Sequence, residues 1–141
     1  MTRDVPADGL DEAFGAVARR LRAASMEAFA AYDVTPSQVR AIRVLAAQDS
    51  GGVRSSELAQ RLKIAPRSAT EVVDALEAKG LVSRSPDPGD RRAVRVALTA
   101  KGHALSEEVR RARGAESERL FERLSESDRE ALARILRKLQ D

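Results

Sequence analysis

The chain has 141 residues, of which 33% are charged and 43% hydrophobic, and its formal net charge at pH 7 is +3. This length favours one compact domain with a core of its own and leaves no room for a second, catalytic domain. Because the sequence has no cysteine, disulfides, thiolate metal sites and cysteine nucleophiles are excluded.

The positive charge is concentrated in the middle of the chain. Residues 51–102 hold ten Lys or Arg and six Asp or Glu, whereas the remainder holds fifteen and sixteen. This distribution favours an anionic partner for the middle segment. Residues 1–12 carry charges and a proline where a signal peptide needs an apolar run, and no stretch of about 18 apolar residues occurs. We therefore expect a cytoplasmic protein that does not associate with membranes.

Two helices are predicted first. Apolar residues recur every three or four positions from Leu10 to Tyr32, the period of one face of a long helix. Thr35-Pro36-Ser37-Gln38 then combines an N-cap, a proline at the first helical position and a glutamine three residues after the cap. This pattern is a capping box, and it predicts a second helix through about Ala47.

Two short helices with a tight connection follow. Ser55 is expected to cap the first of them, Pro66 to begin the second and Gly80 to end it. Their predicted buried positions are Leu58, Ala59, Leu62, Ala69, Val72, Val73 and Leu76. Such a pair, with small polar and basic residues at the start of the second helix, is typical of a helix-turn-helix.

A β-hairpin and two more helices complete the chain. Residues 81–84 and 94–98 are strand-like and flank the turn-rich segment 86–92. Thr99 is expected to cap a long helix, and Ser127-Asp128-Arg129-Glu130 is a second capping box that begins a final helix. The element order predicts a mainly α (α+β) fold, a winged helix-turn-helix with a two-stranded wing and flanking terminal helices.

Three stretches of sequence resemble the MarR (multiple-antibiotic-resistance regulator) family. They are RSATEVVDALEAKGLVSR at residues 67–84, DPGDRR at 87–92 and VALTAKG at 96–102. The resemblance implies a homodimer whose first and last helices form the interface, with two lobes that bind a palindromic operator. Apolar stripes on the terminal helices agree with it, because a second copy would keep them from water.

Within one compact domain, we expect three regions. An N-terminal dimerisation helix occupies residues 1–34, the winged helix-turn-helix occupies 35–99, and C-terminal dimerisation helices occupy 100–141.

Base contacts are expected from the start of the helix that begins at Pro66, because N-terminal residues of a recognition helix reach base edges. The residues there that the core does not need are Arg67, Ser68, Thr70 and Glu71. Arg67 could bind guanine and Glu71 could accept from cytosine, while Ser68 or Thr70 could bond a phosphate or touch a thymine methyl. The alternative is that the four residues only keep the helix start soluble.

The tip of the hairpin carries two adjacent arginines, Arg91 and Arg92. Arginines on a tight turn suit insertion into the narrow, electronegative minor groove. The resemblance implies that the first of them, Arg91, makes this contact. It also implies that Asp90 and Arg92 form a salt-bridged pair that shapes the wing, which leaves Arg92 either structural or in contact with DNA.

Six more residues have two interpretations each. Arg54, Lys79, Arg84 and Arg95 are either phosphate contacts or plain surface charges. Ser55 and Ser56 either touch phosphate or only cap their helix.

A ligand pocket is expected only from the resemblance, which implies that a small aromatic or phenolic compound binds between the dimer helices and the DNA-binding lobe. Met26, Phe29 and Tyr32 are the candidates, although such side chains more often belong to a core or an interface. His103 is the only histidine, and without cysteine it makes no convincing metal site or catalytic dyad. We therefore expect no metal, no cofactor and no enzymatic activity.

The sequence thus predicts a homodimeric, sequence-specific transcription regulator, a ligand-responsive repressor whose partners are double-stranded DNA and a second copy of itself. One alternative is a sequence-tolerant architectural DNA binder, with steep salt dependence and little sequence preference. The other is a winged helix used for protein contacts, because a fold does not determine a function. That module would not need Arg91 at the tip of a wing.

Overall fold

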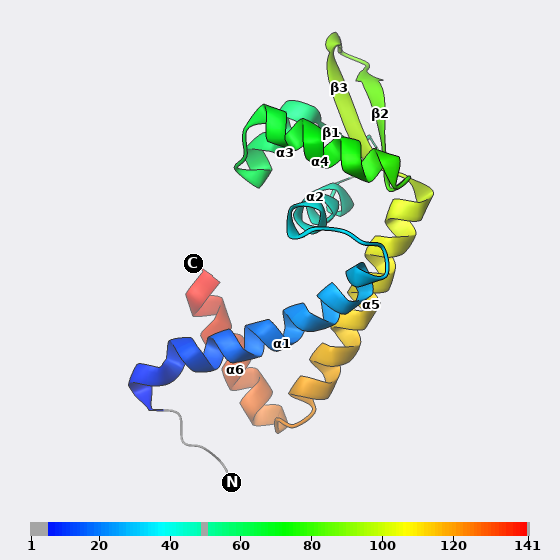
Figure 1. Cartoon of the computed structure of the whole chain (residues 1–141). Coiled ribbons are helices and arrows are strands. Elements are labelled where there is room, and N and C mark those ends of the chain that lie inside the picture. The colour runs from blue at the N-terminus through cyan, green and yellow to red at the C-terminus, as the bar shows by residue number, and fades with distance from the viewer. Residues whose placement is uncertain (1–5, 49–50, 141) are drawn as a thin grey trace. The chain divides into compact units, whose positions relative to one another are not determined.

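The computed structural model describes residues 6–48 and 51–140 (Figure 1). After a short 3-10 turn, η1 (Ala7–Gly9), the helices and strands are α1 (Leu10–Ala30), α2 (Pro36–Ala46), β1 (Val53–Arg54), α3 (Ser55–Leu62), α4 (Pro66–Ala78), β2 (Val82–Asp87), β3 (Asp90–Leu98), α5 (Ala100–Phe121) and α6 (Glu126–Gln140). This order confirms the predicted winged helix-turn-helix with flanking helices. The expectation that residues 1–12 are not a signal peptide falls partly on residues 1–5, which lie outside the described ranges.

The chain divides into two compact units. Residues up to Met26, together with those from Arg110 onward, form one unit, and Glu27–Val109 form the other. The hydrophobic core belongs to the second unit, and its fully buried large side chains include Phe29, Ile42, Leu58, Leu76, Leu81, Val96 and Leu105. Across residues 6–48 and 51–140, no helix is both long and apolar enough to span a lipid bilayer.

Local capping signals account for where several helices begin and end. At α2, the Gln38 N–H donates to Thr35 Oγ1 at 3.3 Å and the Thr35 N–H donates to Gln38 Oε1 at 3.2 Å, which is the predicted capping box. At α5, Thr99 Oγ1 accepts from the Gly102 N–H at 3.1 Å, as expected. Gly80 follows α4 with a φ of +72°, the left-handed geometry that ends a helix.

Two predicted caps are wrong by one or two residues. Arg54, not Ser55, occupies the N-cap of α3, because the extended backbone of β1 reaches Arg54 and the helix begins at once. At α6 the Asp128 N–H donates to Ser125 Oγ at 3.2 Å, so Ser125 is the capping residue in place of Ser127. Both serines precede an acidic residue at the third position, so the motif alone did not separate them.

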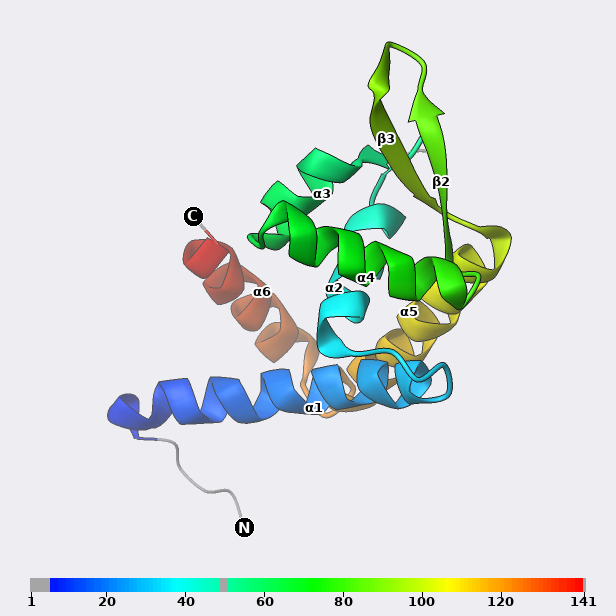
Figure 2. The same cartoon turned by 45° about the horizontal axis from the view of Figure 1, so that its top comes forward.

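The sheet is antiparallel with strand order β1-β3-β2. The hairpin strands run further than predicted, since β2 continues through Asp87 and β3 begins at Asp90, which leaves Pro88-Gly89 as the turn. Strand β1, with only two residues, pairs Val53 with Val96 and was not predicted. Figure 2 shows the β2-β3 hairpin projecting beyond α3 and α4 within the Glu27–Val109 unit.

Candidate nucleic-acid interface

The start of α4 presents polar side chains to solvent. Arg67, Ser68, Thr70 and Glu71 are all exposed, whereas Ala69 between them is buried. The Thr70 hydroxyl donates to the Pro66 carbonyl at 3.1 Å, which uses its one donor and leaves its oxygen able to accept. Within the described ranges, the Arg67 guanidinium has no hydrogen-bond or ionic partner. These positions therefore have the exposure that base contact requires.

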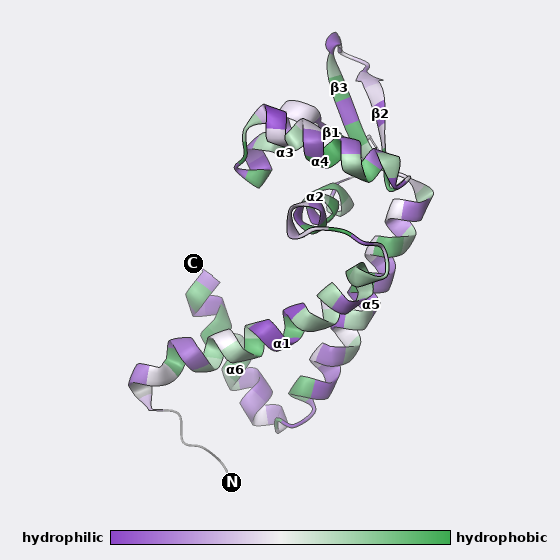
Figure 3. Ribbon diagram, in the orientation of Figure 1, coloured by the Kyte–Doolittle hydropathy of each residue, from purple (hydrophilic) through white to green (hydrophobic). Residues whose placement is uncertain are grey.

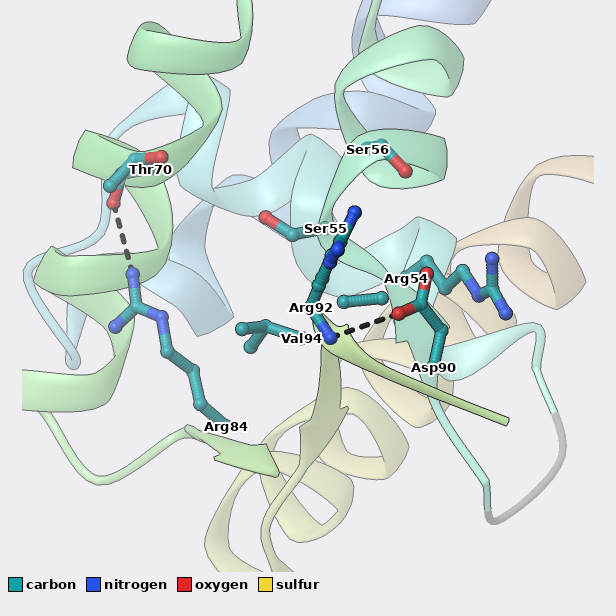
Figure 4. Close-up of a pocket in the computed structure, with 9 residues that line it drawn as sticks. Arg54, Ser55, Ser56, Thr70, Arg84, Asp90, Arg92 and Val94 are labelled. Carbon is teal, nitrogen blue, oxygen red and sulfur yellow. Dashed lines mark hydrogen bonds between the residues drawn. The ribbon is translucent and has the colours of Figure 1, made fainter. Parts of the chain in front are cut away.

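At the tip of the wing, both arginine side chains are exposed and have no polar partner among the residues that the structure describes. The link between Asp90 and Arg92 runs through the backbone, because the Arg92 N–H donates to Asp90 Oδ1 at 2.9 Å (Figure 4). The ion pair implied by the family resemblance is not formed here. An aspartate that accepts from the N–H two residues on shapes the turn locally and leaves the guanidinium unused.

The ion pairs of the wing belong instead to Asp87, which the sequence analysis did not single out. Its Oδ2 accepts from Arg54 Nε at 2.8 Å and from Arg95 Nε at 3.0 Å. Its Oδ1 accepts from the Gly89 N–H at 2.7 Å. One buried carboxylate thus ties β1, β3 and the turn of the hairpin together. The Asp-Pro-Gly sequence was a signal for the turn bond, but not for the two distant arginines.

These contacts lower the pKa of Asp87 from 3.8 to about 2. The hydrogen bond from Arg54 is the largest cause, followed by the bond from the Gly89 N–H, and the charges of Arg54 and Arg95 add to it. Burial acts in the opposite direction, because it disfavours the charged form. The carboxylate therefore stays ionised at neutral pH.

Arg84 and Arg95 are engaged inside the protein. From β2, Arg84 reaches α4, where it donates to Asp74 Oδ1 at 2.6 Å, to Glu77 Oε1 at 3.0 Å and to the Thr70 carbonyl at 3.4 Å. Besides its bond to Asp87, Arg95 donates from Nη1 to the carbonyls of Gly51 at 3.3 Å and Gly52 at 3.0 Å. Their contact with phosphate stays a prediction, but both side chains have a structural role.

A pocket of about 540 Å³ lies where α3, α4 and the hairpin meet (Figure 4). Its lining is formed by Arg54, Ser55, Ser56, Thr70, Arg84, Asp90, Arg92, Ala93 and Val94. Half of the expected DNA-binding residues come together here, whereas Arg67, Ser68, Glu71, Lys79, Arg91 and Arg95 do not line it. The lining also includes the Asp90 carboxylate, and Arg84 is already paired with Asp74 and Glu77. Arg54, Arg92 and the three hydroxyl groups are therefore the groups that suit this surface to anionic oxygens.

The three expected ligand residues occupy different environments. Phe29 is a core residue with only 1% of its surface exposed. Tyr32 packs against that core, and its hydroxyl donates to Glu108 Oε2 at 3.2 Å, a bond that raises the pKa of Tyr32. Met26 is exposed and belongs to the other unit. Their role in a ligand pocket remains a prediction.

Known proteins resemble this chain in sequence and in fold. The model of the MarR family matches residues 34–94. The HTH-type transcriptional repressor MdtR of Bacillus subtilis (strain 168) is 31% identical over 124 residues, which cover 88% of this chain and 79% of that protein.

Two solved structures have the same fold. The structure of RV1404 from Mycobacterium tuberculosis has a TM-score of 0.84 and 28% identity, and the match covers 99% of this chain and 96% of that one. A mutant of S. aureus MepR bound to oligodeoxyribonucleotide has a TM-score of 0.72 and 22% identity, over 93% of this chain and 95% of that one. Sequence, element order and fold therefore agree: the chain belongs to the MarR family of transcription regulators, which are not enzymes.

Proposed function

We propose that this protein is a cytoplasmic, homodimeric, ligand-responsive repressor that binds a pseudo-palindromic operator through its winged helix-turn-helix. One observation carries the proposal: the exposed polar start of α4 belongs to the same compact unit, Glu27–Val109, as the wing-tip arginines, whose side chains have no polar partner among the described residues. A recognition helix with a basic wing beside it can read the major groove and contact the minor groove at once.

The proposed contacts follow from side-chain chemistry. Arg67 binds a guanine edge and Glu71 accepts from a cytosine amino group, while Ser68 and Thr70 contact phosphate or a thymine methyl. Arg91 enters the minor groove, where arginine responds to groove width and potential more than to base identity. The exposure of all five side chains supports this assignment.

Self-association is supported by apolar side chains that a single chain leaves in water. On α1 the exposed residues Leu10, Phe14 and Val17 recur at helical spacing, and on α6 Ile135 and Leu139 do the same. Figure 3 shows hydrophobic residues recurring between hydrophilic ones along both helices. No residue of α6 is buried in the isolated chain. A second copy would cover these apolar residues, and a dimer would match the two half-sites of a palindrome.

A ligand would act by binding two states of the dimer unequally, because a ligand of equal affinity for both shifts nothing. We propose that a small aromatic or phenolic compound contacts Met26, Phe29 and Tyr32 and lowers operator affinity. Titration of benzoates and phenols against the protein–operator complex tests this step. Release of DNA by such a compound, reduced by Met26→Ala, is the expected result, and retention of DNA with every compound would remove the ligand from the proposal.

The experiment that tests the function is selection of bound sequences from a random duplex pool at about 150 mM salt, where the nonspecific contribution is held down. We expect an inverted repeat with half-sites about one helical turn apart. Binding without enrichment would indicate the architectural alternative. No binding to any duplex would indicate a protein-interaction module.

Arg91→Ala tests the wing on the selected operator. The substitution should weaken binding by roughly 1–3 kcal/mol, because it removes a groove contact. Arg61→Ala is the matched control, since Arg61 is an exposed arginine on α3 that pairs with Glu57 at 2.9 Å. Equal affinity of Arg91→Ala and wild type in fluorescence anisotropy would remove the wing contact from the proposed interface.

A further inference from the structure

The Asp87 contacts point to a role beyond shaping the hairpin. We propose that Asp87 is a positioning residue of the DNA-binding surface, which holds Arg54 so that the terminal nitrogens of its guanidinium bind a DNA phosphate beside Ser55 and Ser56. The inference rests on the proposed function and adds a specific phosphate contact to it.

The first observation is the contrast in exposure between the two partners. The Asp87 side chain is 3% exposed, whereas the Arg54 side chain is 45% exposed. Arg54 donates to Asp87 from Nε, at 2.8 Å. A guanidinium has five N–H donors, and within residues 6–48 and 51–140 the four on Nη1 and Nη2 of Arg54 have no partner. Asp87 therefore holds the inner edge of the group and leaves its outer end available.

The second observation is that the two arginines on this carboxylate are used differently. Arg95 donates to the same Oδ2 from Nε at 3.0 Å, but its Nη1 is turned to the carbonyls of Gly51 and Gly52. Arg95 is thus engaged within the protein and helps to hold Asp87 in place. Arg54 has more donors left for a ligand than Arg95, because both of its terminal nitrogens lack a partner among the described residues, and it is the one of the two that lines the pocket.

The third observation is what lies beside Arg54. Ser55 and Ser56 directly follow it, and all three residues line the 540 Å³ pocket together with Arg92 (Figure 4). A phosphate offers several acceptor oxygens, and charge-assisted bonds from a pre-oriented guanidinium are the strong ones. In Figure 4 the Arg54 guanidinium extends away from the Ser55 and Ser56 hydroxyls, so those hydroxyls are available to a neighbouring phosphate rather than to the same one. The occupant of this part of the pocket is therefore a phosphate of the DNA backbone.

The proposal predicts an effect of unusual sign. Removing a carboxylate from a DNA-binding protein ordinarily strengthens binding, because repulsion of the phosphates is reduced. Asp87→Asn should instead weaken binding, since Arg54 loses its ionic anchor and must be ordered when DNA binds. Glu57→Gln is the matched control, because it removes the same charge from an exposed position on α3.

Affinities for the selected operator should be measured by fluorescence anisotropy over a series of salt concentrations. We expect roughly tenfold weaker binding for Asp87→Asn and for Arg54→Gln, and equal or tighter binding for Glu57→Gln. Arg54→Gln should also reduce the slope of log K against log salt by about 0.9 for each subunit bound, as expected for one lost phosphate contact. Arg61→Gln, which removes the same charge, should leave the slope close to that of wild type.

The double variant tests whether Asp87 acts through Arg54. Asp87→Asn with Arg54→Gln should bind about as well as Arg54→Gln alone, whereas multiplied losses would show that the two residues act separately and would overturn the proposal. Asp87→Asn binding as tightly as Glu57→Gln would overturn it too. If circular dichroism shows that Asp87→Asn is unfolded, the slopes of Arg54→Gln and Arg61→Gln decide, and equal slopes would overturn the proposal. Failure of the wild type to bind any duplex would instead overturn the proposed function.

Discussion

Asp87 is a carboxylate that burial should penalise, yet the fold keeps it charged. Its two arginine partners and the Gly89 N–H compensate for the water that it loses. Those partners lie 33 and 8 residues away along the chain, at Arg54 and Arg95. A motif of a few neighbouring residues could predict the turn at Asp-Pro-Gly, but it could not predict that Asp87 would meet Arg54 and Arg95.

The lowered pKa of Asp87 makes stability depend on pH in acid. The pKa of this carboxyl group is about 2 in the folded protein and 3.8 ordinarily. Its contribution to the stability of the fold is therefore complete above pH 3.8 and is lost as the pH falls toward 2. We expect the free energy of unfolding of wild type to fall more steeply than that of Asp87→Asn between about pH 4 and pH 2. Urea denaturation at a series of pH values measures both. Parallel curves for the two proteins would contradict the assignment.

A glycine is required at position 102 because the backbone of Leu81 passes very close to it. A Cβ built on it would lie 2.1 Å from the Leu81 carbonyl oxygen, which accepts from the Thr99 N–H. Gly102→Ala should therefore destabilise the protein, although alanine ordinarily stabilises a helix interior. Gly114→Ala on the same helix is the control, since nothing lies within 4 Å of its Cβ, and it should stabilise by about 0.5–1 kcal/mol. Equal changes in the melting temperature for Gly102→Ala and Gly114→Ala would contradict this account.

The start of α6 tests the capping assignment at the scale of an element. Ser125→Ala removes the acceptor of the Asp128 N–H and should cost about 0.5–2 kcal/mol in the free energy of unfolding. Ser127→Ala should cost less, because the Ser127 hydroxyl bonds the Ser125 hydroxyl, at 3.1 Å, and caps no backbone N–H within the described part of the chain. Urea denaturation compares the two variants. A larger loss in the free energy of unfolding for Ser127→Ala would show that Ser127 is the capping residue, as the sequence motif indicated.

The elements themselves were largely foreseeable. Helix α2 begins where Thr35 and Gln38 predict, and α4 ends at Gly80, because caps depend on residues within about one turn. Strand β1 was not foreseeable, since two residues carry no periodicity and Val53 pairs with Val96, 43 positions away along the chain. The length of the hairpin depended on the same cross-strand pairing, which carries β3 back to Asp90.

The proposed dimerisation concerns the whole molecule, and it can be tested on the exposed apolar residues of the terminal helices. Phe14 is 59% exposed and Leu139 is 71% exposed. A charge on such a residue should prevent self-association, because it would be buried without a partner. We expect Phe14→Glu and Leu139→Glu to reduce the mass measured by light scattering from twice 15.3 kDa toward 15.3 kDa.

Val94→Glu is the control for that experiment, since Val94 is an exposed apolar residue on β3, away from both terminal helices. Its mass should equal that of wild type. A dimer that persists in both Phe14→Glu and Leu139→Glu would show that these residues do not form the interface.

The sequence by itself determined the order of the elements, most helix caps, the polar start of α4 and the resemblance to the MarR family, because each depends on neighbouring residues and their spacing. Only the tertiary structure decided what each arginine does. Arg54, Arg84 and Arg95 meet carboxylates from other elements, whereas the side chains of Arg67 and Arg91 meet none among the residues described. The physical reason is that an ion pair depends on distance in space, which a linear pattern of charges does not contain.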